Sequence, residues 1–377
     1  MKKWLLVFVS LLLVFAMGAC STQTETTEAP DTTEAATEAQ ETEAPEETEA
    51  ESVQTEDEEA QTPADALIAF TKAELDKQLA PLPESGQNEK VGALIISLTN
   101  PFWVNMENRY MEAAEELGIQ LEVLSGTTEG DTTSQLETLM TMATKDYDAI
   151  ILSPIEGTNL IPGIVQANQN EIPVINLGPG VDEEALQEAG GHLDGKITVN
   201  FEEQGEMVAN DMIGRLPDGG QVAILQGLSG AGQSEGRTAG AQRVFEANDT
   251  MELVAVQPCD WDATIAYDAT KDIITANPDL KGIFAVNDVM ALAAVEALKS
   301  EGREDVLVYG VDFTDDAKAA IQAGEMTGSV TYSTEIYTQA GLMMAMKIAQ
   351  GQELTEPVYC PLTLVTVDTV DQYEDWR

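Results

Sequence analysis

Short apolar runs alternate with amphipathic stretches along most of the chain from residue 91 onward. The runs are nearly continuous in apolar residues, which is typical of parallel strands covered by helices on both faces. The stretches between most of them have helical spacing, and regular strand–helix alternation predicts an α/β fold. The predicted strands lie within 91–98, 119–126, 148–154, 172–178, 220–227, 251–258, 281–287, 305–312 and 326–332.

The alternation is interrupted once, by an irregular stretch at 178–199 that follows four predicted strands. A second series then begins with the helical pattern at 200–216. Taken together, these strand–helix units are too many for one domain of usual size. We therefore predict two α/β lobes with parallel sheets. Before the first lobe, residues 63–89 predict one additional helix and a linker that contains Pro and Gly.

Polar and aromatic residues follow several predicted strands, where open parallel sheets bind their ligands. Amide, carboxylate and guanidinium groups make directed hydrogen bonds to hydroxyls, and aromatic faces cover the apolar face of a sugar ring. Such a combination in a concave site is typical of small-molecule binding. The candidates are Asn100, Phe102, Trp103, Trp261, Asn287, Asp312 and Tyr332, together with Arg237 in a Gly- and Ser-rich loop that leads into a helix.

Each candidate also has a structural interpretation that the sequence leaves open. Asn100 before Pro101 is a favoured helix N-cap, and Asn287 and Asp312 stand where they could cap helices. Arg237 could form a surface ion pair, and the aromatic residues could pack in a core.

The first residues carry a different kind of signal. Residues 1–19 contain two lysines, an apolar stretch and small residues before Cys20, which predicts a secretory signal peptide. "MGAC" resembles a bacterial lipobox, so we expect a lipid on the Cys20 sulfur. Residues 20–62 hold 15 acids and no Lys or Arg, which predicts a disordered acidic tether.

Charge and chemistry narrow the function further. The net charge is −49; the tether carries −15 and Lys2 and Lys3 carry +2, so residues 63–377 carry −36. This acidity argues against binding to nucleic acid or to anionic lipid surfaces. His192 is the only histidine and has no activated nucleophile beside it in the sequence, so we expect no enzyme activity, metal or cofactor. Whether Cys259 and Cys360 form a disulfide is left open.

Six stretches together resemble the type 1 periplasmic binding proteins of the ribose-binding family, the solute receptors of sugar ABC transporters. They are "TNPFW", "ANQNEIPVINL", "QGLSGAGQSEGR", "QPCDWD", "FAVNDVMALAAVEAL" and "VYGVDFTDDA". The resemblance covers about 90–370 and implies two Rossmann-like lobes that close on a ligand. It also implies three hinge crossovers near 199–200, 332–333 and 361–362. The N-terminal lobe would then hold 90–199 and 333–361, and the C-terminal lobe 200–332 and 362–377.

By position, the family's ligand contacts fall on Asn100, Phe102, Trp103, Arg237, Trp261, Asn287 and Asp312. Two further positions depart from the family pattern. An Asp-Arg pair of ribose binders is replaced by Gly178-Pro179, which we expect at the pocket wall, and a Gln is replaced by Tyr332. The resemblance therefore implies a sugar, polyol or similar ligand other than ribose, with room for a bulkier one.

The function so implied is that of a monomeric lipoprotein on the extracytoplasmic face of a bacterial cell membrane, delivering its ligand to an ABC transporter permease. The alternative is a sensing subunit for chemotaxis, a sensor kinase or a quorum signal such as a furanone-type autoinducer. A sugar-responsive transcriptional regulator shares the implied fold, but the N-terminal sequence lacks a helix-turn-helix pattern.

Overall fold

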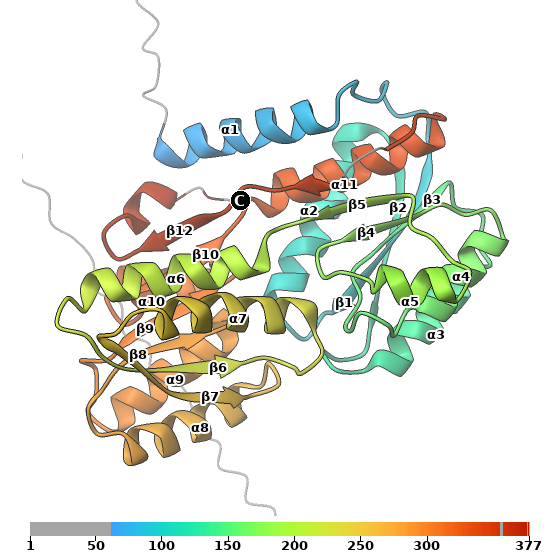
Figure 1. Ribbon diagram of the computed structural model, residues 1–377. Helices are drawn as coiled ribbons and strands as arrows, with labels where there is room; N and C mark the ends of the chain where they lie inside the picture. The colour runs from blue at the N-terminus through green and yellow to red at the C-terminus, as the bar shows by residue number, and fades with distance from the viewer. Residues whose placement is uncertain (1–61, 355–356, 375, 377) are drawn as a thin grey trace, which may run out of the picture. The chain divides into compact units, whose positions relative to one another are not determined.

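The computed structural model describes residues 62–354, 357–374 and 376 (Figure 1). The expected signal peptide, Cys20 and the tether up to residue 61 lie outside these residues. Thr62, which we assigned to the tether, is instead the N-cap of the first helix, α1 (Pro63–Gln78), with its side chain accepting from the Asp65 backbone. None of the described helices has the length and apolar character needed to cross a bilayer.

The N-terminal lobe is built on a six-stranded parallel sheet with the order β11-β5-β4-β3-β1-β2. Its strands are β1 (Lys90–Ser97), β2 (Gln120–Gly126), β3 (Ala149–Leu152), β4 (Val174–Leu177), β5 (Gly195–Thr198) and β11 (Val358–Tyr359). Its helices are α2 (Pro101–Leu117), α3 (Thr132–Met142), α4 (Ile161–Gln169), α5 (Glu183–Glu188) and α11 (Thr334–Ala349).

The C-terminal lobe has a second six-stranded sheet with the order β12-β10-β9-β8-β6-β7, parallel except for the antiparallel pair of β10 and β12. Its strands are β6 (Gly220–Gln226), β7 (Met251–Pro258), β8 (Leu280–Ala285), β9 (Leu307–Val311), β10 (Gly328–Thr331) and β12 (Thr363–Thr366). Its helices are α6 (Phe201–Arg215), α7 (Gly232–Glu246), α8 (Ala263–Ala276), α9 (Asp288–Ser300), α10 (Asp315–Gln322) and the 3-10 turn η1 (Val370–Tyr373). The prediction of two α/β lobes is confirmed (Figure 1).

The stretch at 178–199 is not irregular, and that expectation was wrong. It contains α5 and the strand β5, which pairs with β4 and β11. Only Ile197 and Thr198 of β5 are fully buried, and α5 has six residues, so neither element contains enough apolar positions to reveal its period. The two short strands after residue 357, β11 and β12, escaped prediction for the same reason.

The chain passes from one sheet to the other three times, from β5 to α6, from β10 to α11 and from β11 to β12. Because each strand series runs parallel, the carboxyl ends of β1 to β4 and of β6 to β9 face the space between the lobes. Each lobe has its own apolar core, and that of the N-terminal lobe includes Met343, Met344 and Met346 of α11.

Helix α1 packs onto this frame from outside. Leu75 and Leu79 join the core of the N-terminal lobe, and the buried Lys347 ammonium of α11 donates to the carbonyls of Leu79 (2.6 Å) and Pro81 (2.5 Å). Figure 1 shows α1 lying along α11. The same helix also lies beside β11 and beside η1, which follows β12 of the C-terminal lobe. It therefore touches elements on both sides of the third crossover.

Candidate functional site

A small cavity of about 30 Å³ lies between the lobes and is lined by residues from both. The N-terminal lobe contributes residues that follow β1 and β2, and the C-terminal lobe contributes residues from α7 and from the ends of β7, β8 and β9. The structure here brings together seven of the eight predicted ligand residues. The lining consists of Asn100, Phe102, Trp103, Glu129, Gln233, Arg237, Trp261, Asn287 and Asp312.

The first turn of α2 supplies the wall on the side of the N-terminal lobe. Asn100 is the N-cap of α2, as its sequence context predicted, and accepts a hydrogen bond from the Phe102 backbone at 3.0 Å. Phe102 and Trp103 stand edge to face with their ring centroids 5.0 Å apart. Both rings pack against the core of the lobe and also border the cavity. The same two side chains therefore serve the core and the wall of the site.

Arg237 on α7 is buried, which rules out the interpretation of a surface ion pair. Its Nε donates to Gln204 Oε1 of α6 at 2.7 Å, and its Nη1 donates to the Val286 carbonyl at 2.7 Å. Its Nη2 lies 3.6 Å from Asp312 Oδ1, which is too long for a strong hydrogen bond. One edge of the guanidinium is therefore fixed by the protein, and the other remains available to a ligand.

Two pairs of residues at the site have positive φ angles, which are rare for residues other than Gly. The pairs are Asp260 (53°) with Trp261 (63°) after β7, and Asp312 (112°) with Phe313 (54°) after β9. Backbone strain from such φ angles persists only where the surrounding structure fixes the conformation, and strained residues are common at functional sites. The Trp261 ring also needs Gly227, because a Cβ at that position would lie 2.3 Å from the ring.

Several buried polar atoms at the cavity have no hydrogen-bond partner among the described residues. Asn287 caps α9 by accepting from the Met290 backbone at 3.0 Å, but its Nδ2 is unpaired. Gln233 Oε1, at the start of α7, is also unpaired. An unpaired buried polar group costs about 1–3 kcal/mol, so a donor and an acceptor are both available to a ligand with hydroxyl groups.

Two carboxyl groups, one from each lobe, face the cavity. Burial raises the pKa of Asp312 to about 7 against the opposing effect of Arg237. Burial also raises the pKa of Glu129 to about 7, opposed by its hydrogen bond from Ser97 Oγ (3.0 Å) and reinforced by the charge of Asp312. Asp288, which accepts from the Thr314 backbone at 2.7 Å, fixes the loop that carries Asp312.

Sequence reasoning missed Glu129 and Gln233. A single Glu has little weight in so acidic a chain, although its position directly after the second strand was a usable signal. Gln233 belongs to the same Gly- and Ser-rich loop that pointed to Arg237.

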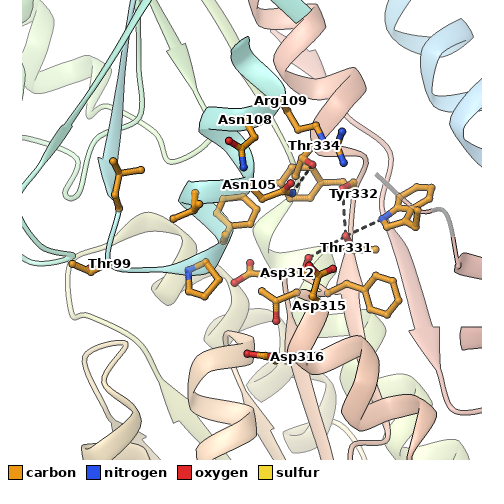
Figure 2. A pocket seen from close by; sticks show the side chains of 17 residues that line it. Thr99, Asn105, Asn108, Arg109, Asp312, Asp315, Asp316, Thr331, Tyr332 and Thr334 are labelled. Atoms are coloured by element: carbon orange, nitrogen blue, oxygen red, sulfur yellow. Dashed lines mark hydrogen bonds between the residues drawn. The ribbon is translucent and has the colours of Figure 1, made fainter. Parts of the chain in front are cut away.

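Tyr332 does not line the small cavity. It borders a second, larger pocket of about 600 Å³ between the lobes, shown in Figure 2, which we call the outer pocket. Tyr332 is buried and stacks edge to face with Phe102 (6.2 Å) and Tyr337 (5.0 Å). The residues that line the outer pocket are Leu98, Thr99, Pro101, Phe102, Val104, Asn105, Asn108, Arg109, Asp312, Phe313, Thr314, Asp315, Asp316, Thr331, Tyr332, Thr334 and Trp376.

Gly178 and Pro179 line neither space. The Gly178 carbonyl accepts from Thr198 Oγ1 at 2.9 Å, and the Pro179 carbonyl accepts from Asn176 Nδ2 at 2.7 Å. Cys259 and Cys360 are buried free thiols, which answers the open question of a disulfide. His192 lies at the surface, with its Nε2 3.5 Å from Asp194.

A sequence profile described as "Periplasmic binding protein domain" matches residues 91–353. The chain belongs to this family. This periplasmic binding protein is 32% identical to the D-allose-binding periplasmic protein of Escherichia coli. The alignment spans 250 residues, which are 66% of this chain and 80% of the relative. The protein is 27% identical to the ribose import binding protein of Haemophilus influenzae, over 80% of this chain and 99% of the relative.

The fold agrees with these relatives. A crystal structure of an ABC transporter periplasmic solute-binding protein from Actinobacillus succinogenes with bound D-allose matches with a TM-score of 0.71. That protein is 29% identical, and the match covers 76% of this chain and all of the other. These matches confirm the predicted resemblance to sugar-binding periplasmic proteins and the predicted fold of two α/β lobes.

Proposed function

We propose that this protein is the extracytoplasmic solute-binding component of an ABC transporter and captures a neutral sugar or polyol between its lobes. The observation that carries the proposal is the convergence of Phe102, Trp103 and Trp261 with directed polar groups from both lobes. Aromatic faces next to fixed donors and acceptors are complementary to a ring with hydroxyl groups. The relatives that bind D-allose and ribose support the same class of ligand.

Ligand binding would act on the equilibrium between separated and closed lobes. A ligand shifts such an equilibrium only by its difference in affinity for the two states. Asn100 and Glu129 belong to one lobe and Arg237 and Asp312 to the other, so a ligand that reaches both groups favours the closed form. With two carboxyl groups and one guanidinium, the cavity is unfavourable for sugar phosphates and sugar acids.

The binding test is calorimetry on residues 62–377 with a panel of pentoses, hexoses and polyols. We expect Arg237→Ala and Asp312→Ala each to weaken binding at least tenfold, since each removes a buried, directed group. Arg243→Ala is the matched control, because Arg243 lies on the same helix but is exposed and paired with Glu202. Unchanged affinity in both variants would show that the site is wrongly placed; absence of binding by the whole panel would show that the ligand class is wrong.

We also propose that the mature protein is a monomer, lipid-anchored through Cys20 on the outer face of the bacterial cell membrane, where it presents its ligand to the permease. The signal-like sequence before Cys20 supports this localisation. Metabolic labelling with an alkyne fatty acid should label the wild-type protein, and Cys20→Ser should abolish the label and release the protein into the medium.

A further inference from the structure

The two spaces between the lobes differ strongly in size. The small cavity of about 30 Å³ offers the volume of roughly one water molecule. The outer pocket, at about 600 Å³, falls within the usual range of roughly 300–1,000 Å³ for small-molecule sites. Phe102 and Asp312 border both spaces, so the two spaces lie against the same side chains.

The outer pocket is built from both lobes and from a crossover between them. In Figure 2, Asn105, Asn108 and Arg109 approach it from α2, while Asp315 and Asp316 approach from the start of α10. Thr331, Tyr332 and Thr334 close it along the crossover from β10 to α11. A molecule held there would touch both lobes and one of the three crossovers between them.

The chemistry of the outer pocket resembles that of the small cavity. Phe102, Phe313 and Tyr332 provide aromatic surface. The side chains of Asn108, Asp315 and Asp316 make no hydrogen bond within the described part of the chain and are exposed to an occupant. These groups accept and donate hydrogen bonds in the manner that hydroxyl-rich ligands require.

Charge limits the occupant further. The one guanidinium of the outer pocket, that of Arg109, donates through Nη1 to Glu112 at 2.6 Å. The carboxyl groups of Asp312, Asp315 and Asp316 therefore outnumber the available positive charge. The pocket favours a neutral, hydroxyl-bearing group over an anionic one.

We propose that the outer pocket is a second compartment of the ligand site, which takes a second sugar unit or a neutral aglycone, so that the ligand is a glycoside larger than a monosaccharide. This inference rests on the proposed function. A glycoside that spans both compartments passes Phe102 and Asp312 and gains contacts with α2, α10 and the crossover. Because those contacts join both lobes, they add to the stabilisation of the closed form.

The test compares monosaccharides with their larger derivatives. Calorimetry would use D-allose, D-ribose and D-glucose, their methyl and phenyl glycosides, and a set of glucose disaccharides. We expect at least one phenyl glycoside or disaccharide to bind at least tenfold more tightly than its parent monosaccharide. Asn108→Trp, which fills the outer pocket from an exposed position on α2, should reduce that preference to less than twofold.

Met111→Trp is the matched control, since Met111 is an exposed residue of the same helix that does not line the pocket. It should keep the preference for the larger ligand. If monosaccharides bind and the larger derivatives are excluded or gain nothing, the second compartment is refuted while the proposed function stands. The second compartment is also refuted, with the proposed function unaffected, if Asn108→Trp keeps the full wild-type preference for the larger ligand. If no carbohydrate binds the wild-type protein, both proposals fail.

Discussion

At the scale of single residues, Glu129 and Asp312 form an acidic pair that spans the two lobes. Each has a pKa raised to about 7, chiefly by burial. A carboxyl group whose pKa is higher in the folded state binds more protons there than in the unfolded chain. Its stabilising contribution is complete at low pH and is lost as the pH rises through the folded pKa. The ligand-free protein with closed lobes should therefore lose stability between about pH 5 and pH 8.

The substitution Glu129→Gln tests this pair, because the amide keeps the size of the side chain and removes its titration. We expect the midpoint of thermal unfolding of the ligand-free protein to fall less between pH 5 and pH 8 in the variant than in the wild type. Glu137→Gln, at an exposed position of α3, should leave the wild-type pH dependence unchanged. Parallel pH profiles for Glu129→Gln and the wild type would contradict the conclusion that the raised pKa of Glu129 contributes to the loss of stability.

Single site residues were predictable only where position and residue type agreed. Asn100, Asn287 and Asp312 lie within three residues of the carboxyl ends of the apolar strands β1, β8 and β9, and parallel strands place these ends at one edge. The sequence could not show that Arg237 is buried or that Tyr332 borders the outer pocket. Both depend on contacts with residues far along the chain, such as Val286 for Arg237 and Phe102 for Tyr332.

At the scale of elements, the position of Arg237 depends on the close approach of α6 and α7. Gly205 of α6 faces the Arg237 backbone, where an added Cβ would lie 2.0 Å from the carbonyl oxygen. Gly240 of α7 faces Glu202, where a Cβ would lie 1.9 Å from the carbonyl oxygen. These glycines let the helices approach closely enough for Gln204 to hold the guanidinium.

Gly240→Ala should therefore separate α6 from α7. We expect a loss of about 1–3 kcal/mol in the free energy of unfolding, measured by urea titration, together with weaker ligand binding as Gln204 moves away from Arg237. Gly214→Ala is the control on α6, because a Cβ there meets no atom within 4 Å. It should be neutral or stabilise the protein by up to about 1 kcal/mol. Equal stability of the two variants would show that the helices can separate without cost.

The strands themselves were predictable where the apolar run was long or unbroken. The strands of seven or eight residues, β1, β2, β6 and β7, correspond to predicted runs, and so do β3, β4 and β10, which have only four residues but are buried throughout. The missed strands β5, β11 and β12 are short and only partly buried. Two of the missed strands, β11 and β12, pair with neighbours distant in sequence, β5 and β10. Their existence is a property of the assembled sheets and not of their own residues.

At the scale of the whole molecule, α1 precedes the part of the chain that the family profile matches, which begins at residue 91. Its attachment depends on Leu75, Leu79 and the Lys347 ammonium. Burial lowers the pKa of Lys347, and its hydrogen bonds to two backbone carbonyls compensate for that burial.

Lys347→Met should loosen α1. The variant keeps apolar volume but leaves the carbonyls of Leu79 and Pro81 without their donor, at a cost of about 1–3 kcal/mol. Limited proteolysis should then cut the segment 80–88 faster than in the wild type. Lys77→Met, at an exposed position on α1, should leave the cleavage rate unchanged. A wild-type rate in Lys347→Met would mean that the apolar contacts alone hold the helix.

The place of α1 has a mechanical consequence. The segment before residue 62 joins the fold at this helix, so tension along that segment first loads the Lys347 hydrogen bonds and the packing of Leu75. Beyond these contacts, α1 lies beside β11 and η1, on either side of the third crossover. Helix α1 would therefore take up a pull on that segment before it reaches the crossover between the lobes.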